Sequence, residues 1–145
     1  MSINESLQYR ELTEKIIGLF YDVYNELGFG FLESVYEEAM AIALTEAGLK
    51  IQRQYPVPVW FRNRQIGDFK ADLLVEEKII LELKAARALD LAYEKQLLNY
   101  LRGTRLEVGL LLNFGPKAEF KRLAFSNERK SISVYPRASA AKKTL

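Results

Sequence analysis

The feature that most constrains the fold is the stretch from Gly67 to Ala85, GDFKADLLVEEKIILELKA, in which apolar and polar residues alternate. Because successive side chains of a strand point to opposite faces, this pattern predicts two strands joined by a turn at Glu76-Glu77-Lys78. In the first strand the predicted faces are Lys70, Asp72 and Leu74 on one side and Ala71, Leu73 and Val75 on the other. In the second strand they are Ile79, Leu81 and Leu83 on one side and Ile80, Glu82 and Lys84 on the other.

Three polar residues of this hairpin form a candidate metal site. Asp72 and Glu82 are expected on facing strands, near enough for their carboxylates to bind one cation, with the Lys84 ammonium beside them. Such a set suits Mg²⁺ or Mn²⁺, which prefer oxygen ligands and leave positions open for water and phosphate, while a lysine can stabilise charge on a phosphate. The same pattern is typical of the solvent-exposed face of an antiparallel sheet, and these three residues alone leave both interpretations open.

Composition limits the chemistry to oxygen ligands. The 145 residues include no cysteine and no histidine, which excludes disulfides, thiolate or imidazole zinc sites and histidine-based triads. A hydrophobic content of 49% predicts one domain, residues 1–135, followed by a disordered basic tail, residues 136–145. No apolar run approaches the roughly 20 residues of a membrane span, and no signal peptide is evident, so a cytoplasmic protein without a membrane partner is expected.

Charge is a weak guide to partners. The formal net charge is +2, but the last ten residues carry three basic side chains and no acid, which leaves about −1 for the rest. This is not the strongly basic surface of a high-affinity nucleic-acid-binding protein. Arg53, Arg62 and Arg64 lie near the predicted first hairpin, where such charges are commonly just solvated.

The remaining elements follow from hydrophobic periodicity and from the turn residues. Helical spacing predicts helices over 11–27, 32–48 and 91–102, the last capped by Asp90. Residues 49–61 predict an edge strand or a bulge, because Pro56 and Pro58 cannot donate hydrogen bonds. Residues 106–113 predict a buried strand that runs parallel to the hairpin after a crossover helix, and strand-like segments follow at 120–125 and 131–135. The expected fold class is therefore α/β, with a mixed central sheet that combines a three-strand antiparallel meander and a further strand after the crossover helix, flanked by helices.

Residues Gly30 to Tyr36 spell G-x-x-E-x-x-Y, and this resembles the GxxExxY proteins, a branch of the PD-(D/E)XK nuclease superfamily. Further blocks in the same order carry the resemblance from about residue 11 to residue 125: ELTEKIIG, ADLLVEEKIILELKA, QLLNYL and GLLLNFG. The resemblance implies a restriction-endonuclease-like core. It also implies a metal-dependent nuclease that hydrolyses phosphodiester bonds in nucleic acid, with DNA as the expected substrate.

The resemblance assigns roles to individual residues. It implies that Glu33, Asp72 and Glu82 are metal ligands, and that Asp72, Glu82, Lys84 and Gln96 are catalytic. Tyr36, Tyr93 and Tyr100 are implied as residues that contact the substrate or support the ligands. Family members commonly carry histidines where Tyr24 and Tyr93 stand here, so imidazole has no part in this chain's chemistry.

Two other interpretations stay open from the sequence. The chain is short and carries no added DNA-reading domain, which is compatible with a catalytically silent module that binds nucleic acid or a protein partner. The apolar segment from Val57 to Phe61 is a candidate contact surface for a homodimer.

Overall fold

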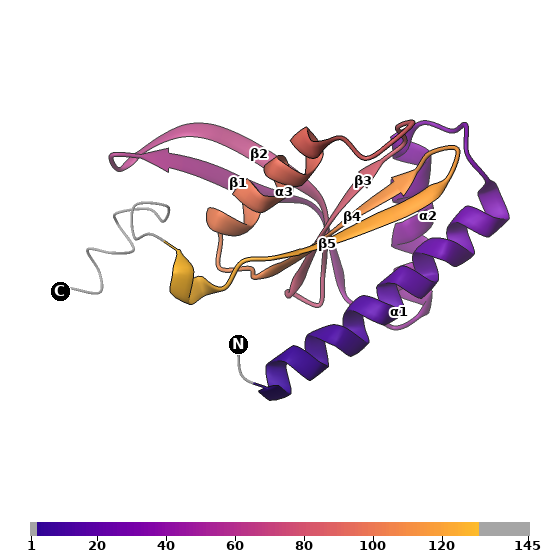
Figure 1. The fold of residues 1–145 in the computed structure, drawn as a ribbon, viewed down its shortest axis with the longest axis horizontal. Helices are drawn as coiled ribbons and strands as arrows, with labels where there is room; N and C mark the ends of the chain where they lie inside the picture. The colour runs from indigo at the N-terminus through magenta and orange to yellow at the C-terminus, as the bar shows by residue number, and fades with distance from the viewer. Residues whose placement is uncertain (1–2, 131–145) are drawn as a thin grey trace.

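The computed structural model describes residues 3–130, which form a five-stranded sheet with helices on both faces (Figure 1). The helices are α1 (Ile3–Leu27), α2 (Glu33–Glu46) and α3 (Leu91–Arg102), with a short 3₁₀ helix η1 (Asn127–Arg129) near the end. The strands are β1 (Ile51–Phe61), β2 (Arg64–Val75), β3 (Ile79–Lys84), β4 (Val108–Phe114) and β5 (Ala118–Ala124). The predicted elements within this range are present, while the predicted strand at 131–135 and the tail at 136–145 lie outside the described residues.

The strands lie in the sheet in the same order as in the chain. β1, β2 and β3 form the predicted antiparallel meander, and β4 runs parallel to β3 after the crossover through α3. β5 then pairs antiparallel with β4 at the other edge. The mixed α/β sheet predicted from the sequence is therefore confirmed.

Two hydrophobic cores lie on opposite faces of the sheet. The larger core packs α1 and α2 against one face and includes Phe20, Tyr36, Met40, Leu81 and Phe114. The smaller core packs α3 against the other face and includes Val57, Leu74, Ile80, Leu97 and Leu111. Because both faces are covered, β4 is buried along its whole length, as its continuous apolar sequence predicts (Figure 1).

The first hairpin is longer than its sequence suggests. β1 continues through both prolines as an edge strand, with an irregularity between Val59 and Trp60, so that the expected edge position is confirmed. The turn contains only Arg62 and Asn63, both with positive φ (49° and 67°), which is the backbone of a tight two-residue hairpin turn. The hairpin formed by β1 and β2 consequently extends beyond the other strands (Figure 1).

One predicted face assignment is wrong. Strict alternation places Ala71 beside Leu73 and Val75, but Ala71 packs in the core under α3, whereas the other two pack in the core under α1 and α2. Opposite this point on β1, Gln54 has a φ of 52° and interrupts the pairing between Arg53↔Leu73 and Tyr55↔Ala71. The left-handed residue breaks the pleat, so the strand changes faces at Asp72.

No helix within residues 3–130 is long and apolar enough to cross a membrane.

Candidate active site

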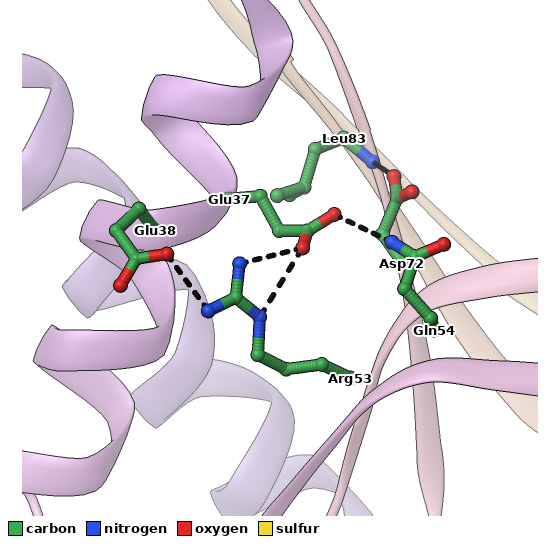
Figure 2. A network of polar contacts seen from close by, with 6 residues as sticks. All are labelled: Glu37, Glu38, Arg53, Gln54, Asp72 and Leu83. Atoms are coloured by element: carbon green, nitrogen blue, oxygen red, sulfur yellow. Dashed lines mark hydrogen bonds and ion pairs between the residues drawn. The ribbon is translucent and has the colours of Figure 1, made fainter.

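Asp72 and Glu82 lie where the pairing between β2 and β3 ends; we call this pair the carboxylate fork. The ladder runs from Val75↔Ile79 to Leu73↔Leu81 and stops there. Beyond it, the Asp72 N–H donates to Glu82 Oε1 at 3.1 Å, and the Leu83 N–H donates to Asp72 Oδ2 at 2.8 Å (Figure 2 shows the second bond). Two side-chain carboxylates thus take the place of ladder hydrogen bonds, which places them together as the sequence predicts.

Burial controls the protonation of the fork. Glu82 is only 5% exposed, and burial, followed by the negative charge of Asp72, raises its pKa to about 8. The pKa of Asp72 is also raised, mainly by burial. Among the described residues, ion pairs form at Arg53 and Lys121, and none of them reaches the fork. The fork therefore disfavours two negative charges unless a cation is added.

These properties fit a divalent metal ion. Two carboxylates at one buried point offer the hard oxygen ligands that Mg²⁺ and Mn²⁺ prefer, and a cation there would offset the cost of ionising both groups. Residues 3–130 contain no group of three or more acidic side chains arranged to hold a metal. The arrangement thus brings two side-chain carboxylates together, and the third carboxylate ligand that the resemblance implies stays a prediction.

Lys84 stands at the end of β3, two residues after Glu82. Its Nζ lies 4.7 Å from the centroid of the Tyr93 ring on α3, a distance at which a cation and an aromatic face attract each other. Its positive charge lowers the pKa values of Asp72 and Glu82, although burial outweighs that effect at both groups. The structure thus places Lys84 within electrostatic range of the fork and places Tyr93 against Lys84.

Glu33 is the first residue of α2 and is exposed. Its Oε2 accepts a hydrogen bond from the Ala85 N–H at 3.3 Å, so it touches the residue that follows Lys84. Because no third acidic side chain joins the fork within residues 3–130, a ligand role for Glu33 stays a prediction.

The α3 residues Tyr93, Gln96 and Tyr100 line one stripe, as their spacing predicts. Tyr100 is buried, and burial, followed by the charges of Glu82 and Asp72, raises its pKa to about 12. Gln96 is half-buried and lines an open groove together with Tyr100. Tyr100 therefore lines the groove and lies within electrostatic range of the fork.

Tyr36 lies away from the fork, in the core under α1 and α2. Its hydroxyl donates to the Gly28 carbonyl at 2.6 Å and accepts from the Phe31 N–H at 3.3 Å, and its ring stacks on Phe114 at 4.3 Å. The ring is fully buried and the hydroxyl holds the loop before Glu33, which is a supporting position, and a contact with substrate stays a prediction.

Sequence reasoning missed a polar cluster next to the fork; we call it the Arg53 cluster, consisting of Glu37, Glu38, Arg53 and Gln54. Arg53 donates to Glu37 and Glu38, and the Gln54 amide donates to Glu37 at 2.9 Å (Figure 2). The charge of Glu37 adds to the burial that raises the pKa of Asp72. In the sequence, Glu37 follows Glu33 by one helical turn, and this spacing was the signal that both lie on the same side of α2.

Asn113 is a second residue that the sequence analysis did not single out. It is fully buried at the end of β4, opposite Lys84, where its side chain accepts from the Ala86 N–H and donates to the Ala86 carbonyl, both at 2.9 Å. These two bonds anchor the chain just after Lys84. The signal for it was one polar side chain at the end of the otherwise apolar run VGLLLN.

The groove beside the fork has a volume of about 1080 Å³ and lies between the β1–β2 hairpin and α3. Its lining is mostly apolar and includes Val57, Trp60, Phe61 and Phe69 from the hairpin. The groove and the fork are thus neighbours along one face of α3.

Comparison with known proteins agrees with this architecture. No curated protein matches the chain. A solved structure titled "Crystal structure of SSO0001" is similar, with a TM-score of 0.51 and 15% identity over 64% of this chain. The match covers 50% of that protein's length, and at this identity it supports the fold alone. Residues 10–123 match the family model for the PD-(D/E)XK nuclease superfamily. The chain therefore belongs to the PD-(D/E)XK nuclease superfamily, and its mixed sheet flanked by helices is consistent with a restriction-endonuclease-like fold.

Proposed function

We propose that the protein is a metal-dependent nuclease that hydrolyses phosphodiester bonds in DNA, with the carboxylate fork as its active site. The observation that carries this proposal is the meeting of the half-buried Asp72 and the buried Glu82 at one point, with Lys84 beside them, in a chain of a nuclease superfamily. The motif formed by Gly30, Glu33 and Tyr36 supports placing the chain in the GxxExxY branch.

In this proposal the carboxylates of Asp72 and Glu82 and the carbonyl of Leu83 hold Mg²⁺ or Mn²⁺, with Glu33 as a further ligand. When bound, the ion polarises the phosphate and lowers the pKa of a bound water. The buried position favours this chemistry, because electrostatic interactions are stronger where water is excluded.

The other residues orient the reactants. Lys84, held by the Tyr93 ring, positions the attacking water and stabilises the negative charge that develops on the phosphate. The water oxygen forms a bond to phosphorus and gives up one proton to solvent, the P–O ester bond breaks, and the leaving oxygen takes up one proton from solvent. Gln96 and Tyr100 stand on the α3 side, where the substrate backbone approaches the fork.

The decisive experiment is a cleavage assay with single-stranded, double-stranded and branched DNA and with RNA, in Mg²⁺ and in Mn²⁺. We expect cleavage of DNA that falls by about 100-fold or more in Lys84→Ala, the loss typical of removing one charge-stabilising group. Lys78→Ala, in the β2–β3 turn, is the matched control and should cleave as the intact protein does. Equal cleavage by the Lys84→Ala variant would point to a contaminating nuclease and would refute the assignment.

A second candidate function is a catalytically silent module that binds nucleic acid or a protein partner. The observation in its favour is that residues 3–130 contain no group of three acidic side chains arranged for a metal. The same assay separates the two candidates, because this module would cleave none of the substrates in either metal.

A further inference from the structure

We propose that the groove between the β1–β2 hairpin and α3 binds an unpaired segment of the polynucleotide, so that the substrate of the fork is single-stranded or has a single-stranded end. This inference rests on the proposed function, since it places the strand that the fork would cut. It concerns a surface that lies outside the carboxylate fork.

The groove presents aromatic surface that the fold itself does not cover. Trp60, Phe61 and Phe69 line it from the hairpin, and the side chains of Phe61 and Phe69 are 53% and 47% exposed. Stacking on aromatic side chains is the common way in which proteins hold unpaired bases, because every base has a π face. A duplex hides these faces within its own stack, so a mostly apolar groove suits an unpaired strand.

The charges of the groove complement a polyanion. Arg62, Lys95 and Arg102 line it, and no aspartate or glutamate is among its lining residues. A second copy of the chain is less suitable as the occupant, because a twofold contact would bring these three cations towards their own equivalents. Cations beside aromatic rings match a strand whose phosphates and bases bind side by side.

The groove also leads to the proposed reaction centre. Gln96 and Tyr100 line the groove, and Tyr100 is close enough to the fork for the charges of Glu82 and Asp72 to raise its pKa. Phe69 lies 6.1 Å from the Tyr100 ring, which continues the aromatic surface from the hairpin to α3. A strand bound in the groove would therefore pass beside the carboxylates.

The test is a binding titration in EDTA, which keeps binding separate from cleavage. Trp60 is the only tryptophan of the chain, so its fluorescence reports directly on the groove. An oligothymidylate should change this fluorescence to saturation and bind more tightly than a duplex of equal length. Phe61→Ala and Lys95→Glu should each weaken binding by about tenfold, as expected for one stacking or phosphate contact.

Matched controls come from outside the groove: Phe120→Ala on β5 and Lys15→Glu on α1 should bind as the intact protein does. Two outcomes would overturn the inference: duplex that binds as tightly as the single strand, or groove variants that bind normally. A concentration-dependent dimer that changes the Trp60 fluorescence without DNA would overturn it as well. Single-strand binding in the groove without any cleavage would leave the inference standing and refute the nuclease proposal alone.

Discussion

The carboxylate fork and the Arg53 cluster each contain two acidic side chains, but they differ in ion pairing and in burial. In the Arg53 cluster, Glu37 and Glu38 each lie 2.8 Å from the guanidinium of Arg53, which is 40% exposed. In the fork, Glu82 is buried and Asp72 is half-buried, and both accept hydrogen bonds only from backbone N–H groups. The acids of the Arg53 cluster form ion pairs with Arg53, whereas no ion pair among the described residues involves the acids of the fork, and the nearby charge of Lys84 offsets their burial only in part.

This difference indicates which acids are available for a ligand. The charge of a carboxylate that is paired with arginine is already balanced, so the stability of the protein depends little on whether a metal ion binds there. A buried carboxylate without a cationic partner costs free energy whenever it is ionised, and a bound metal would recover that cost. The fork is therefore the place where a metal changes stability most, and the Arg53 cluster serves as its internal control.

The largest effect is expected in the pH dependence of stability without metal. The ordinary pKa of Glu82, 4.5, is raised to about 8 in the folded protein, so the folded state keeps a proton that the unfolded state has lost. The free energy of unfolding should fall as pH rises from about 4.5 to about 8, by roughly 5 kcal/mol, and then change little. The raised pKa of Asp72 acts in the same direction.

Denaturant unfolding in EDTA from about pH 5 to about pH 9 measures this slope. Glu82→Gln should remove most of it and should be more stable than the intact protein at high pH, while Glu37→Gln should retain it. An intact protein whose stability is flat over this range would contradict the raised pKa.

The next effect is stabilisation by metal. Mg²⁺ or Mn²⁺ at about a hundredfold excess over its Kd should raise the free energy of unfolding by about 3 kcal/mol, with a matching rise in melting temperature. The rise should disappear in Glu82→Gln and persist in Glu37→Gln. Persistence in both variants would move the metal away from the fork, and absence in the intact protein would argue against any metal site.

The smallest effect is expected at the Arg53 cluster. Arg53→Ala should lower the free energy of unfolding by less than about 1 kcal/mol, because its ion pairs are partly exposed and screened by water. Added salt should reduce the difference further. A loss of several kcal/mol in urea unfolding would show that the cluster supports the fork structurally and would remove its value as a control.

The hairpin of the fork could be predicted because its information is local. Alternation and the Glu76–Lys78 turn are enough to place Asp72 and Glu82 on neighbouring strands, and the structure does so. The assignment of Ala71 was wrong because the irregularity comes from another strand. Gln54 on β1 has a left-handed backbone conformation, and the residue pattern of β2 does not indicate it.

The Arg53 cluster and the groove could not be derived in the same way. Arg53 contacts Glu37, which lies 16 residues away in the sequence, and the groove combines a hairpin tip with a helix that begins 28 residues after the end of that tip's turn (91 − 63). Such contacts depend on how the elements pack, and hydrophobic periodicity does not predict which polar residues come into contact.

The sequence by itself determined the order of helices and strands, the parallel crossover and the hairpin that brings the two carboxylates of the fork together, because periodicity, turns and caps act over a few neighbouring residues. Only the tertiary structure decided that Glu82 is buried with a raised pKa, that Tyr36 supports a loop, and that Arg53 neutralises Glu37 and not Asp72. Burial and charge pairing depend on distances between segments far apart in the chain, and those distances exist only once the sheet and helices have packed.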